Sequence, residues 1–562
     1  MSLKKDDCVR LTIEDIGTGG EGIGKVDGFT LFVKDAVIGD VIEAKVMKAK
    51  KSYGYAKLLR VVTPSKDRVE AKCPVARQCG GCQIQEMRYE AQLAFKQNMV
   101  RNNLERIGGI HDYEMCPIIG MEEPFHFRNK AQFPVGEDKN GNIVIGFYAG
   151  RTHYIVENMD CCIGAEVNQD ILAAVKSYMQ ENHIRPYHEE RHEGLIRHVL
   201  IRTGYHTNEI MVCLIVNADR KDQLKNVDRL IDVLKNISGM TSIMVNFNRE
   251  KTNVILGDTS EVLWGKAYIE DYIGDVKYQI SPQSFFQVNP QQTEKLYAKA
   301  LEYAGLTGTE TVWDLYCGIG TISLFLTKNA RKVYGVEIVP QAIEDARNNA
   351  KINEIDNAEF FVGKAEEVVP QFYKEALEKA AADGDSEVAK SIHPDVVVVD
   401  PPRKGCEETL LDTIVKMQPQ RIVYVSCDSA TLARDLKILS AQGYRVVKVQ
   451  PVDQFGHSVH VETVVLLSQR KADDYVEVEL ELDEFDVTSA ESKATYAEIK
   501  DYVLKEHGLK VSNLYISQVK RKCGIEVGEN YNLPKSEDSR QPQCSVEKEK
   551  AIKDALEHFG MV

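Results

Sequence analysis

Residues 276–470 alternate between strand-like and helix-like segments, and this alternation limits the fold more than any other feature of the 562-residue chain. Runs of β-forming residues recur as "TVWDLYCG", "KVYGVEIV", "DVVVVDPP", "RIVYVSCD", "YRVVKVQP" and "VETVVLLS", mostly separated by helical stretches. Such alternation predicts a largely parallel, doubly wound sheet of the Rossmann-like type. Because ligands of these sheets bind at the carboxyl ends of the strands, we expect the functional site there.

The remaining segments predict an α/β chain of several domains, since 562 residues exceed what one hydrophobic core supports. The first segment shows short strands separated by glycines, which is typical of an OB-like β-barrel. We expect a barrel at 1–62, an α+β central domain at 63–275, the doubly wound domain at 276–470 and a small α+β extension at 471–562. Within the central domain, a helix over 90–107 is expected to pack on the doubly wound domain.

The first strand of the doubly wound segment leads into "DLYCGIGT" (314–321). Gly318 and Gly320 let the backbone approach a ligand without a Cβ clash. Glu337 ends the next strand, the usual place for a carboxylate that accepts hydrogen bonds from ribose hydroxyls. The third glycine of the dinucleotide fingerprint is missing, so the turn favours S-adenosylmethionine over NAD. The alternative is a tight turn that binds no ligand.

Three further strand ends carry reactive side chains. In "DPPRKG", two prolines stiffen the chain directly after Asp400 and fix that carboxylate over the site. Cys427 follows "RIVYVS", and a helix beginning near Ser429 is expected to lower the pKa of its thiol. The alternative is a buried structural cysteine. Glu462 stands at the start of the last strand, in "HVETVV".

A thiol, a methyl donor and a carboxylate base together predict methylation of uracil at carbon 5. That carbon is a poor nucleophile, but addition of a thiolate at carbon 6 creates an enolate that can attack a sulfonium methyl group. A base then removes the proton at carbon 5 so that the thiol can leave. Cys427 would be the nucleophile and Glu462 the base. The uridine must leave the base stack for both faces to be reached.

A cysteine cluster lies in the predicted central domain. "CPVARQCGGC" places Cys73, Cys79 and Cys82 in a C-x₅-C-x₂-C arrangement, with glycines that permit a tight backbone wrap. An iron–sulfur cluster needs a fourth thiolate, for which "DCCIG" offers Cys161 or Cys162. From spacing alone, zinc remains an equal alternative because four thiolates also suit it.

Five motifs in order, "SFFQVN" (284–289), "DLYCGIGT", "DPPRKG", "SCDSATLARD" and "HVETVVL", resemble the RNA 5-methyluridine methyltransferases. The chain is most similar to the iron–sulfur branch that modifies bacterial 23S ribosomal RNA, over about residues 5–470. The resemblance implies an N-terminal TRAM/OB domain that binds RNA, and a [4Fe–4S] cluster with Cys161 as the fourth ligand. It also implies Gln287, Tyr316, Glu337 and Asp400 around the methyl donor, Cys427 as nucleophile and Glu462 as base.

Charge and composition bear on the partners. The net charge of −15 is unfavourable for nucleic-acid binding, yet "KVMKAKKSYGYAKLLR" (45–60) holds six cations, no anion and two tyrosines, which suit phosphates and stacked bases. No secretion signal or membrane span is visible in the sequence, so we expect a cytoplasmic protein that does not bind a membrane. The resemblance implies 23S ribosomal RNA as the partner, and we expect no obligate protein partner. The alternatives are a transfer-RNA uridine methyltransferase and a non-catalytic iron–sulfur RNA-binding protein. Residues 471–562 would contact RNA or only cover a sheet edge.

Overall fold

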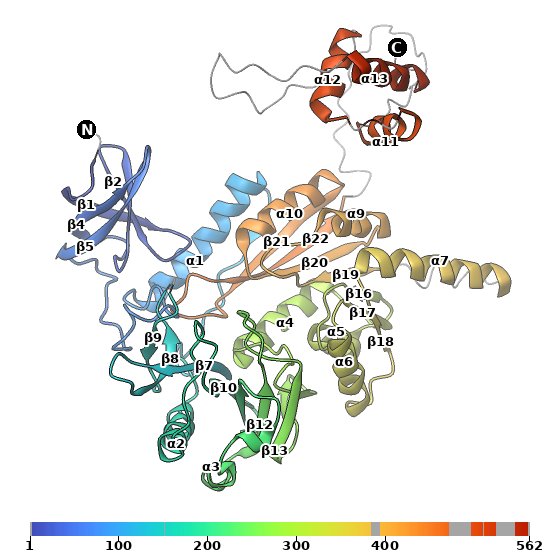
Figure 1. The fold of residues 1–562 in the computed structure, drawn as a ribbon. Helices are drawn as coiled ribbons and strands as arrows, with labels where there is room; N and C mark the ends of the chain where they lie inside the picture. The colour runs from blue at the N-terminus through green and yellow to red at the C-terminus, as the bar shows by residue number, and fades with distance from the viewer. Residues whose placement is uncertain are drawn as a thin grey trace. The chain divides into compact units, whose positions relative to one another are not determined.

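The computed structural model of the chain describes residues 3–150, 152–383, 394–470, 496–507, 509, 511–523 and 546–559. The chain divides into two compact units, Met1–Asp474 and Tyr475–Val562. The first unit contains a small β-barrel, a central seven-stranded sheet and an eight-stranded sheet (Figure 1). Within the described part of the chain, none of the helices combines the length and the apolar character that crossing a bilayer requires.

The N-terminal barrel is closed, which confirms the OB-like prediction. Its five strands follow the order β1-β2-β3-β5-β4. Inward-facing residues such as Leu11, Leu31 and Val46 are buried in its core, because successive side chains of a strand point to opposite faces. The strands are β1 (Cys8–Ile16), β2 (Gly22–Val26), β3 (Phe29–Val33), β4 (Val41–Ala49) and β5 (Tyr53–Thr63).

A long helix follows the cysteine segment in the chain. Helix α1 (Tyr89–Asn103) continues as the π-helix η1 (Leu104–Gly108) and ends at Gly109, whose φ of 66° suits glycine. Val100 and Leu104 are fully buried against helix α10 (Ser429–Ala441). Helix α1 therefore packs on the helix that follows Cys427.

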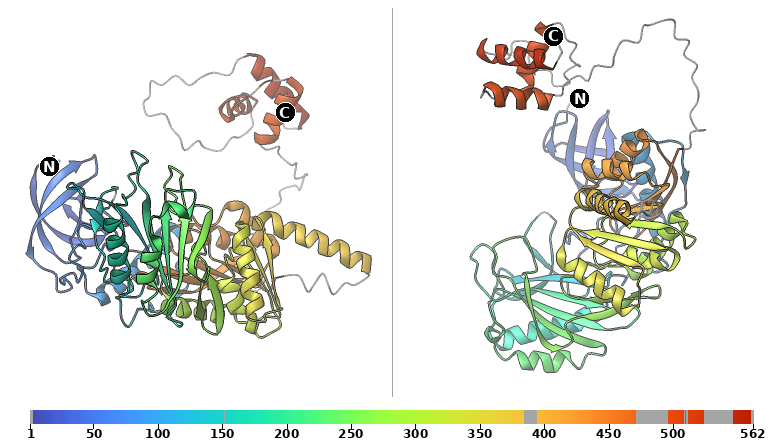
Figure 2. Two further views of the ribbon diagram at one scale, coloured as in Figure 1. Left: turned by 60° about the horizontal axis from the view of Figure 1, so that its bottom comes forward. Right: turned by 90° about the vertical axis from the view of Figure 1, so that its right-hand side faces the viewer.

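The central sheet has the strand order β13-β12-β11-β10-β7-β8-β9. Its members are β7 (Lys130–Glu137), β8 (Ile143–Tyr148), β9 (Ile155–Glu157), β10 (Ile196–Thr203), β11 (Ile210–Val216), β12 (Met240–Phe247) and β13 (Thr259–Gly265). Every residue of β11 is buried, since one face packs on helices α2 (Asn168–Glu181) and α3 (Val227–Leu234) (Figure 2). The other face joins the core around β14 (Ile269–Ile273) and β15 (Val276–Ile280).

The eight-stranded sheet has the order β18-β17-β16-β19-β20-β22-β21-β6. Its first five strands run parallel, whereas β22 is antiparallel to both of its neighbours. Strands β18 and β6 were not expected from the sequence. The members are β6 (Glu114–Met115), β16 (Thr311–Asp314), β17 (Lys332–Glu337), β18 (Ala358–Val362), β19 (Val396–Val399), β20 (Arg421–Ser426), β21 (Tyr444–Val452) and β22 (Glu462–Gln469).

Helices cover both faces of this sheet. In β19, Val396 and Val398 belong to one core, whereas Val397 and Val399 belong to the other. The first core is completed by α4 (Pro290–Ala304), α5 (Thr321–Leu326) and α6 (Pro340–Ile352), and the second by α1, α7 (Ala365–Asp383), α9 (Glu408–Met417) and α10. The sheet is therefore a mixed α/β layer whose strand ends carry the candidate site.

The second unit is helical in its described residues. It contains α11 (Tyr496–His507), α12 (Asn513–Lys522) and α13 (Val546–His558), which share a core of buried residues such as Ile499, Ile516 and Ile552. Any strand of the α+β extension predicted at 471–562 lies outside the described residues.

Candidate active site

The carboxyl ends of the parallel strands line a cavity of about 430 Å³, the size of a small-molecule pocket. Of the residues predicted around the methyl donor, Tyr316, Gly318, Glu337 and Asp400 line this cavity. They come from the turns after β16, β17 and β19. The structure thus brings four of the six predicted positions together, and Gln287 and Gly320 are not among the lining residues.

The two glycines of the turn after β16 have different roles. A Cβ atom on Gly318 would meet nothing within 4 Å, so this backbone faces the open cavity. A Cβ atom on Gly320 would approach Phe360 to 3.2 Å and Ala346 to 3.3 Å. Gly318 therefore fits the predicted close approach of a ligand, whereas Gly320 is required for packing at the start of α5.

Gln287 acts one layer behind the cavity. Its backbone carbonyl accepts a hydrogen bond from Asn129 Nδ2 at 3.0 Å, and its side chain bonds the hydroxyl of Tyr297. The Tyr297 hydroxyl lies 2.9 Å from Thr321 Oγ1, and Thr321 lines the cavity. Gln287 thus supports the wall of the cavity through Tyr297, and its place beside the methyl donor stays a prediction.

Asp314 is a buried acid that sequence reasoning did not single out. It ends β16, and Ser323 Oγ donates a hydrogen bond to its carboxylate at 2.6 Å. Burial raises the pKa of Asp314 to about 6, and this carboxyl group in turn raises the pKa of Asp400. The signal was available, because Asp314 ends a buried strand just as the sequence suggested for Asp400.

Cys427 and Glu462 meet through the register of the sheet. The antiparallel ladder between β20 and β22 pairs Ser426 with Thr463, so Cys427 and Glu462 follow directly after the last pair. The Glu462 side chain is almost fully buried, and that of Cys427 is half-buried. The ends of two neighbouring strands thus place the predicted nucleophile beside the predicted base.

The expected lowering of the Cys427 pKa is wrong. Burial, together with the nearby carboxyl groups of Glu462 and Asp400, raises the pKa of the thiol to about 12. The amide groups at the start of α10 are already occupied, because the Asp428 side chain accepts hydrogen bonds from the backbone N–H groups of Ala430 and Thr431. The helix terminus is therefore neutralised by its own cap. Cys427 rests as a thiol.

Burial and the neighbouring Asp400 also raise the pKa of Glu462. Two buried carboxyl groups at short range cannot both carry a charge at low cost. Arg403 has the opposite effect, because its positive charge lowers the pKa of both Cys427 and Glu462. The site therefore holds a thiol, two carboxyl groups and one cation within electrostatic reach of each other.

Helix α10 holds the loop that carries Asp400 and Arg403. Thr431 Oγ1 donates to the Arg403 carbonyl at 3.1 Å, and Arg434 Nη2 donates to the Lys404 carbonyl at 3.0 Å. The fully buried Asp435 accepts a hydrogen bond from the Cys406 backbone N–H at 2.8 Å. These contacts explain how the chain after β19 keeps its position over the strand ends.

The predicted metal ligands share a second cavity, of about 410 Å³. It is lined by Cys73, Cys79, Cys82, Cys161 and Cys162, together with residues of β7, β8 and β10. The cavity is also lined by Arg128 and Lys130, and no described residue on its wall is Asp or Glu. Burial, together with the positive charges of Arg202 and Arg128, lowers the pKa of Lys130 to about 7.

Among the described residues, no group of three or more His, Cys, Asp or Glu side chains is arranged to hold a metal ion. The thiols surround a cavity and do not meet at one point. Neither the zinc site nor the iron–sulfur cluster is thus confirmed by the structure.

An aromatic group lies on the outer face of the barrel. The ring centroids of Phe32, Tyr53 and Tyr55 are 5.6 to 5.9 Å apart, and Lys50 Nζ stands 4.9 Å from the centre of the Tyr53 ring. Tyr55 is 37% exposed. Rings and cations on one face form the type of surface that binds bases and phosphates.

Comparison with known proteins agrees with this geometry. The family model described as tRNA (Uracil-5-)-methyltransferase matches residues 88–470, and the TRAM domain model matches residues 7–59. The chain belongs to the tRNA (uracil-5-)-methyltransferase family. Both family models end before the second unit begins.

Members of this family with similar sequences are found in several bacteria. An uncharacterized RNA methyltransferase of Halalkalibacterium halodurans is 50% identical over 466 residues, which cover 83% of this chain and 98% of the relative. One of Clostridium tetani is 48% identical over 467 residues, covering 83% and 97%. The predictions of an RNA-binding TRAM domain and of an RNA uracil-5-methyltransferase are thus confirmed at the level of the family.

A solved structure shares the fold of most of the chain. The tRNA (uracil-54, C5)-methyltransferase of Pyrococcus abyssi, in complex with S-adenosyl-L-homocysteine, is 29% identical with a TM-score of 0.64. The match covers 82% of this chain and all of that one. This neighbour supports S-adenosylmethionine as the methyl donor. The choice between ribosomal and transfer RNA is not decided by these matches.

Proposed function

We propose that the protein methylates carbon 5 of a uridine in 23S ribosomal RNA through a covalent bond between Cys427 Sγ and carbon 6 of the ring. The observation that carries the proposal is the meeting of Cys427, Glu462 and Asp400 at the carboxyl edge of the sheet. A thiol beside a buried base has no structural purpose there. Transfer RNA is the alternative substrate, because the Pyrococcus abyssi enzyme is named for it.

The residues of the first cavity fit S-adenosylmethionine. Glu337, at the end of β17, is placed to accept hydrogen bonds from the ribose hydroxyls, and the open backbone at Gly318 allows the ligand to approach. Asp400 lies on the same wall, where burial and Asp314 raise its pKa to about 7, and a bound cation favours its ionised form. When bound, S-adenosylmethionine supplies a methyl group on a positively charged sulfur.

Cys427 must lose its proton before it can attack. The positive charge of Arg403 favours the thiolate, and the Asp400 carboxylate takes the thiol proton, so that Glu462 stays ionised for the last step. Cys427 Sγ then bonds to carbon 6, which makes carbon 5 nucleophilic toward a methyl group.

Glu462 completes the reaction. Once carbon 5 carries the methyl group, the Glu462 carboxylate takes the proton that remains on that carbon. The bond between Cys427 Sγ and carbon 6 breaks, its electron pair returns to sulfur, and the double bond of the ring forms again. The raised pKa of Glu462 suits this step, because a more basic carboxylate takes a carbon-bound proton more readily.

We also propose that Cys73, Cys79, Cys82 and Cys161 hold a [4Fe–4S] cluster. A thiolate-ligated cluster is an anion, and the cavity offers Arg128 and Lys130 without any carboxylate on its wall. A four-iron cluster separates its thiolates more widely than a single zinc ion does, which agrees with thiols around a cavity. The methyl transfer needs no electron, so the cluster would be a structural group. The cysteine segment and the barrel together favour ribosomal RNA.

The test uses 23S ribosomal RNA and transfer RNA from cells that lack the gene, each incubated with enzyme and a labelled methyl donor. We expect 5-methyluridine in the ribosomal RNA and a loss of at least about 10⁴-fold in rate for Cys427→Ala. The exposed Cys8 on β1 provides the control, and Cys8→Ala is expected to keep the wild-type rate. Label in transfer RNA alone would refute the substrate, and an active Cys427→Ala would refute the covalent route.

A further inference from the structure

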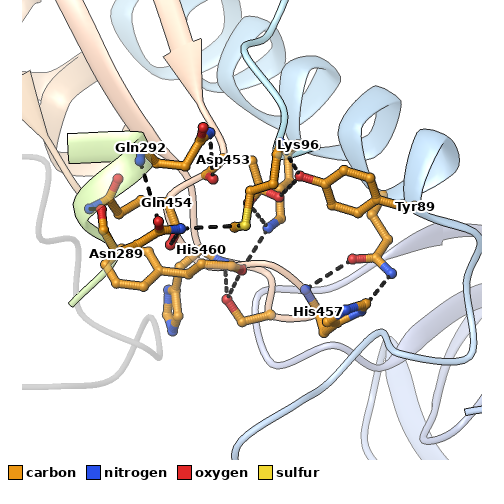
Figure 3. Close-up of polar contacts among 12 residues, drawn as sticks. Tyr89, Lys96, Asn289, Gln292, Asp453, Gln454, His457 and His460 are labelled. Carbon is orange, nitrogen blue, oxygen red and sulfur yellow. Dashed lines mark hydrogen bonds and ion pairs between the residues drawn. The ribbon is translucent and has the colours of Figure 1, made fainter. Parts of the chain in front are cut away.

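The loop formed by residues 453–461 joins the end of β21 to Glu462. Its residues take part in a buried polar network that involves helix α1, the start of α4 and the segment after Cys82 (Figure 3). None of these network residues lines the cavity of the methyl donor. The network must therefore serve a purpose other than binding the methyl donor.

An ion pair fixes the first half of the loop. Lys96 and Asp453 have fully buried side chains, and Lys96 Nζ donates to Asp453 Oδ1 at 2.5 Å and to the Phe455 carbonyl at 2.9 Å. Tyr89 donates a hydrogen bond to the second carboxylate oxygen at 2.7 Å. Apolar side chains of similar volume often stabilise a fold as well as a buried ion pair does. The ion pair between Lys96 and Asp453 is thus better explained by the conformation that it imposes on the loop formed by residues 453–461.

A side-chain amide fixes the second half of the loop. Gln92 Oε1 accepts a hydrogen bond from the His457 backbone N–H at 3.0 Å, and Gln92 Nε2 lies 3.2 Å from His457 Nδ1. The φ of His457 is 65°, a left-handed conformation that is costly for a residue with a side chain. Gln92 therefore holds the loop in a backbone conformation that it would not adopt on its own.

The cysteine segment provides the outer anchor. The backbone N–H groups of Gln83 and Ile84 both donate to the His457 carbonyl at 3.0 Å. Gln83 follows Cys82 directly in the chain. Two hydrogen bonds therefore connect the wall of the cysteine cavity to a residue five positions before Glu462.

Helix α4 holds the loop from the other side. Gln454 Nε2 donates to Thr293 Oγ1 at 2.8 Å, and Gln292 Nε2 donates to the Asp453 carbonyl at 3.1 Å. The loop is thus bonded on two sides by parts of the chain that lie far apart in sequence. A loop held in this way can move only if several buried hydrogen bonds break together.

We propose that Gln92, Lys96 and Asp453 are positioning residues for Glu462, and that the backbone after Cys82 is the outer anchor of this support. The inference rests on the proposed function. Proton removal from carbon 5 requires the carboxylate within hydrogen-bond reach of that carbon, and a displacement of about 1 Å can cost about 100-fold in rate. The network gives the cysteine segment a role in catalysis that involves no electron transfer.

The order of the chemical steps makes the inference testable. A displaced Glu462 leaves Cys427 free to bond to carbon 6 and leaves carbon 5 free to accept the methyl group. Only the last step fails, in which the proton passes from carbon 5 to the carboxylate and the sulfur–carbon bond breaks. The methylated RNA then stays attached to Cys427, whereas a general loss of structure would lower attachment and product together.

The experiment measures both the product and the RNA bound covalently to the full-length enzyme, with a labelled methyl donor and denaturing gels. Gln92→Leu removes the hydrogen bonds to His457, and the double variant Lys96→Met/Asp453→Leu removes both charges without leaving either unpaired. We expect about 100-fold slower product release in both variants, with at least about tenfold more methylated adduct at steady state. Glu462→Gln is the reference for a blocked last step.

Gln97→Leu is the matched control. Gln97 lies on the same helix and accepts a hydrogen bond from the Ile118 backbone N–H at 2.7 Å, so the variant loses one internal bond without touching the loop. We expect wild-type product and adduct levels for it. The inference is overturned if adduct and product fall in parallel in both test variants, or if both keep the wild-type rate. If instead Glu462→Gln forms no adduct, the proposed function itself fails.

Discussion

The two cavities of the first unit are similar in volume and opposite in buried charge. The cavity at the strand ends measures about 430 Å³ and gathers acids, among them Asp400 and Glu337 on its wall and Asp314 behind it. The cysteine cavity measures about 410 Å³ and carries Arg128 and Lys130 with no acid on its described wall. Volume alone would not separate the two sites.

The difference indicates what each cavity is built to hold. A buried charge is costly unless it meets its opposite, so an acidic wall favours a cation and a basic wall favours an anion. The sulfonium group of S-adenosylmethionine is a cation, and a thiolate-ligated iron–sulfur cluster is an anion. The charge of the wall is therefore the feature to alter in each cavity.

The largest effect is expected from reversing the charge of the cysteine cavity. Lys130→Glu places a carboxylate beside the thiols, where it would repel an anionic cluster. If the wild-type protein holds the proposed cluster, we expect the purified variant to lose nearly all of its iron and acid-labile sulfide, measured per chain. Lys139→Glu, on the exposed turn between β7 and β8, should retain the wild-type content. Equal iron in Lys130→Glu would show that this charge is not needed.

A smaller effect is expected from neutralising the acidic wall. Asp400→Asn removes one negative charge from the cavity at the strand ends while keeping nearly the same volume. The affinity for S-adenosylmethionine should fall about tenfold, equivalent to about 1.4 kcal/mol, and that for the uncharged S-adenosylhomocysteine should fall much less. Titration calorimetry of both ligands measures the ratio. Asp412→Asn, exposed on α9, is the control, and an equal loss for both ligands would contradict the charge argument.

A third effect concerns stability and pH. Burial and Asp400 raise the pKa of Glu462, so the folded chain keeps a proton that the unfolded chain has already lost. The free energy of unfolding should therefore fall as pH rises above the ordinary carboxyl range, by about 1.4 kcal/mol per pH unit until Glu462 itself ionises.

The variant Glu462→Gln has no ionisable group at this position, so its free energy of unfolding should not show this fall with pH. We expect it to be more stable than the wild-type protein at pH 8 and nearly as stable at pH 4. It should be inactive, because it lacks the base. Urea unfolding at both pH values provides the measurement. Glu408→Gln, exposed on α9, should follow the wild-type curve. A difference in stability between the wild-type protein and Glu462→Gln that does not grow from pH 4 to pH 8 would show that burial does not raise the pKa of this carboxyl group.

The sequence was sufficient where local pattern determines structure. Alternating strands predicted the barrel and the α/β layer, and strand ends predicted the cavity shared by Glu337 and Asp400 and the position of Cys427 close to Asp400. The short strands β6 and β18 were missed, because two to five residues carry little periodic signal.

The sequence failed where charge and distant contacts decide. The pKa of Cys427 depends on Glu462 and Asp400, which no local motif relates to the thiol. The contact between the Gln287 side chain and Tyr297 is another feature that no local motif could predict. The bond between Gln92 and His457 joins residues 365 positions apart, and neither stands in a recognisable pattern.

The reversed direction of β22 has a consequence for how such an enzyme can arise. In a wholly parallel sheet, the first residue of a strand lies at the edge opposite to the reactive turns. Since β22 runs the other way, its first residue arrives at the reactive edge, one ladder step beyond the pair formed by Ser426 and Thr463. A deletion of one residue in β22 would point the acid to the other face of the sheet. The direction and register of β22 are thus needed for catalysis. On a parallel strand, a glutamate at the first position would lie at the opposite edge of the sheet, away from Cys427.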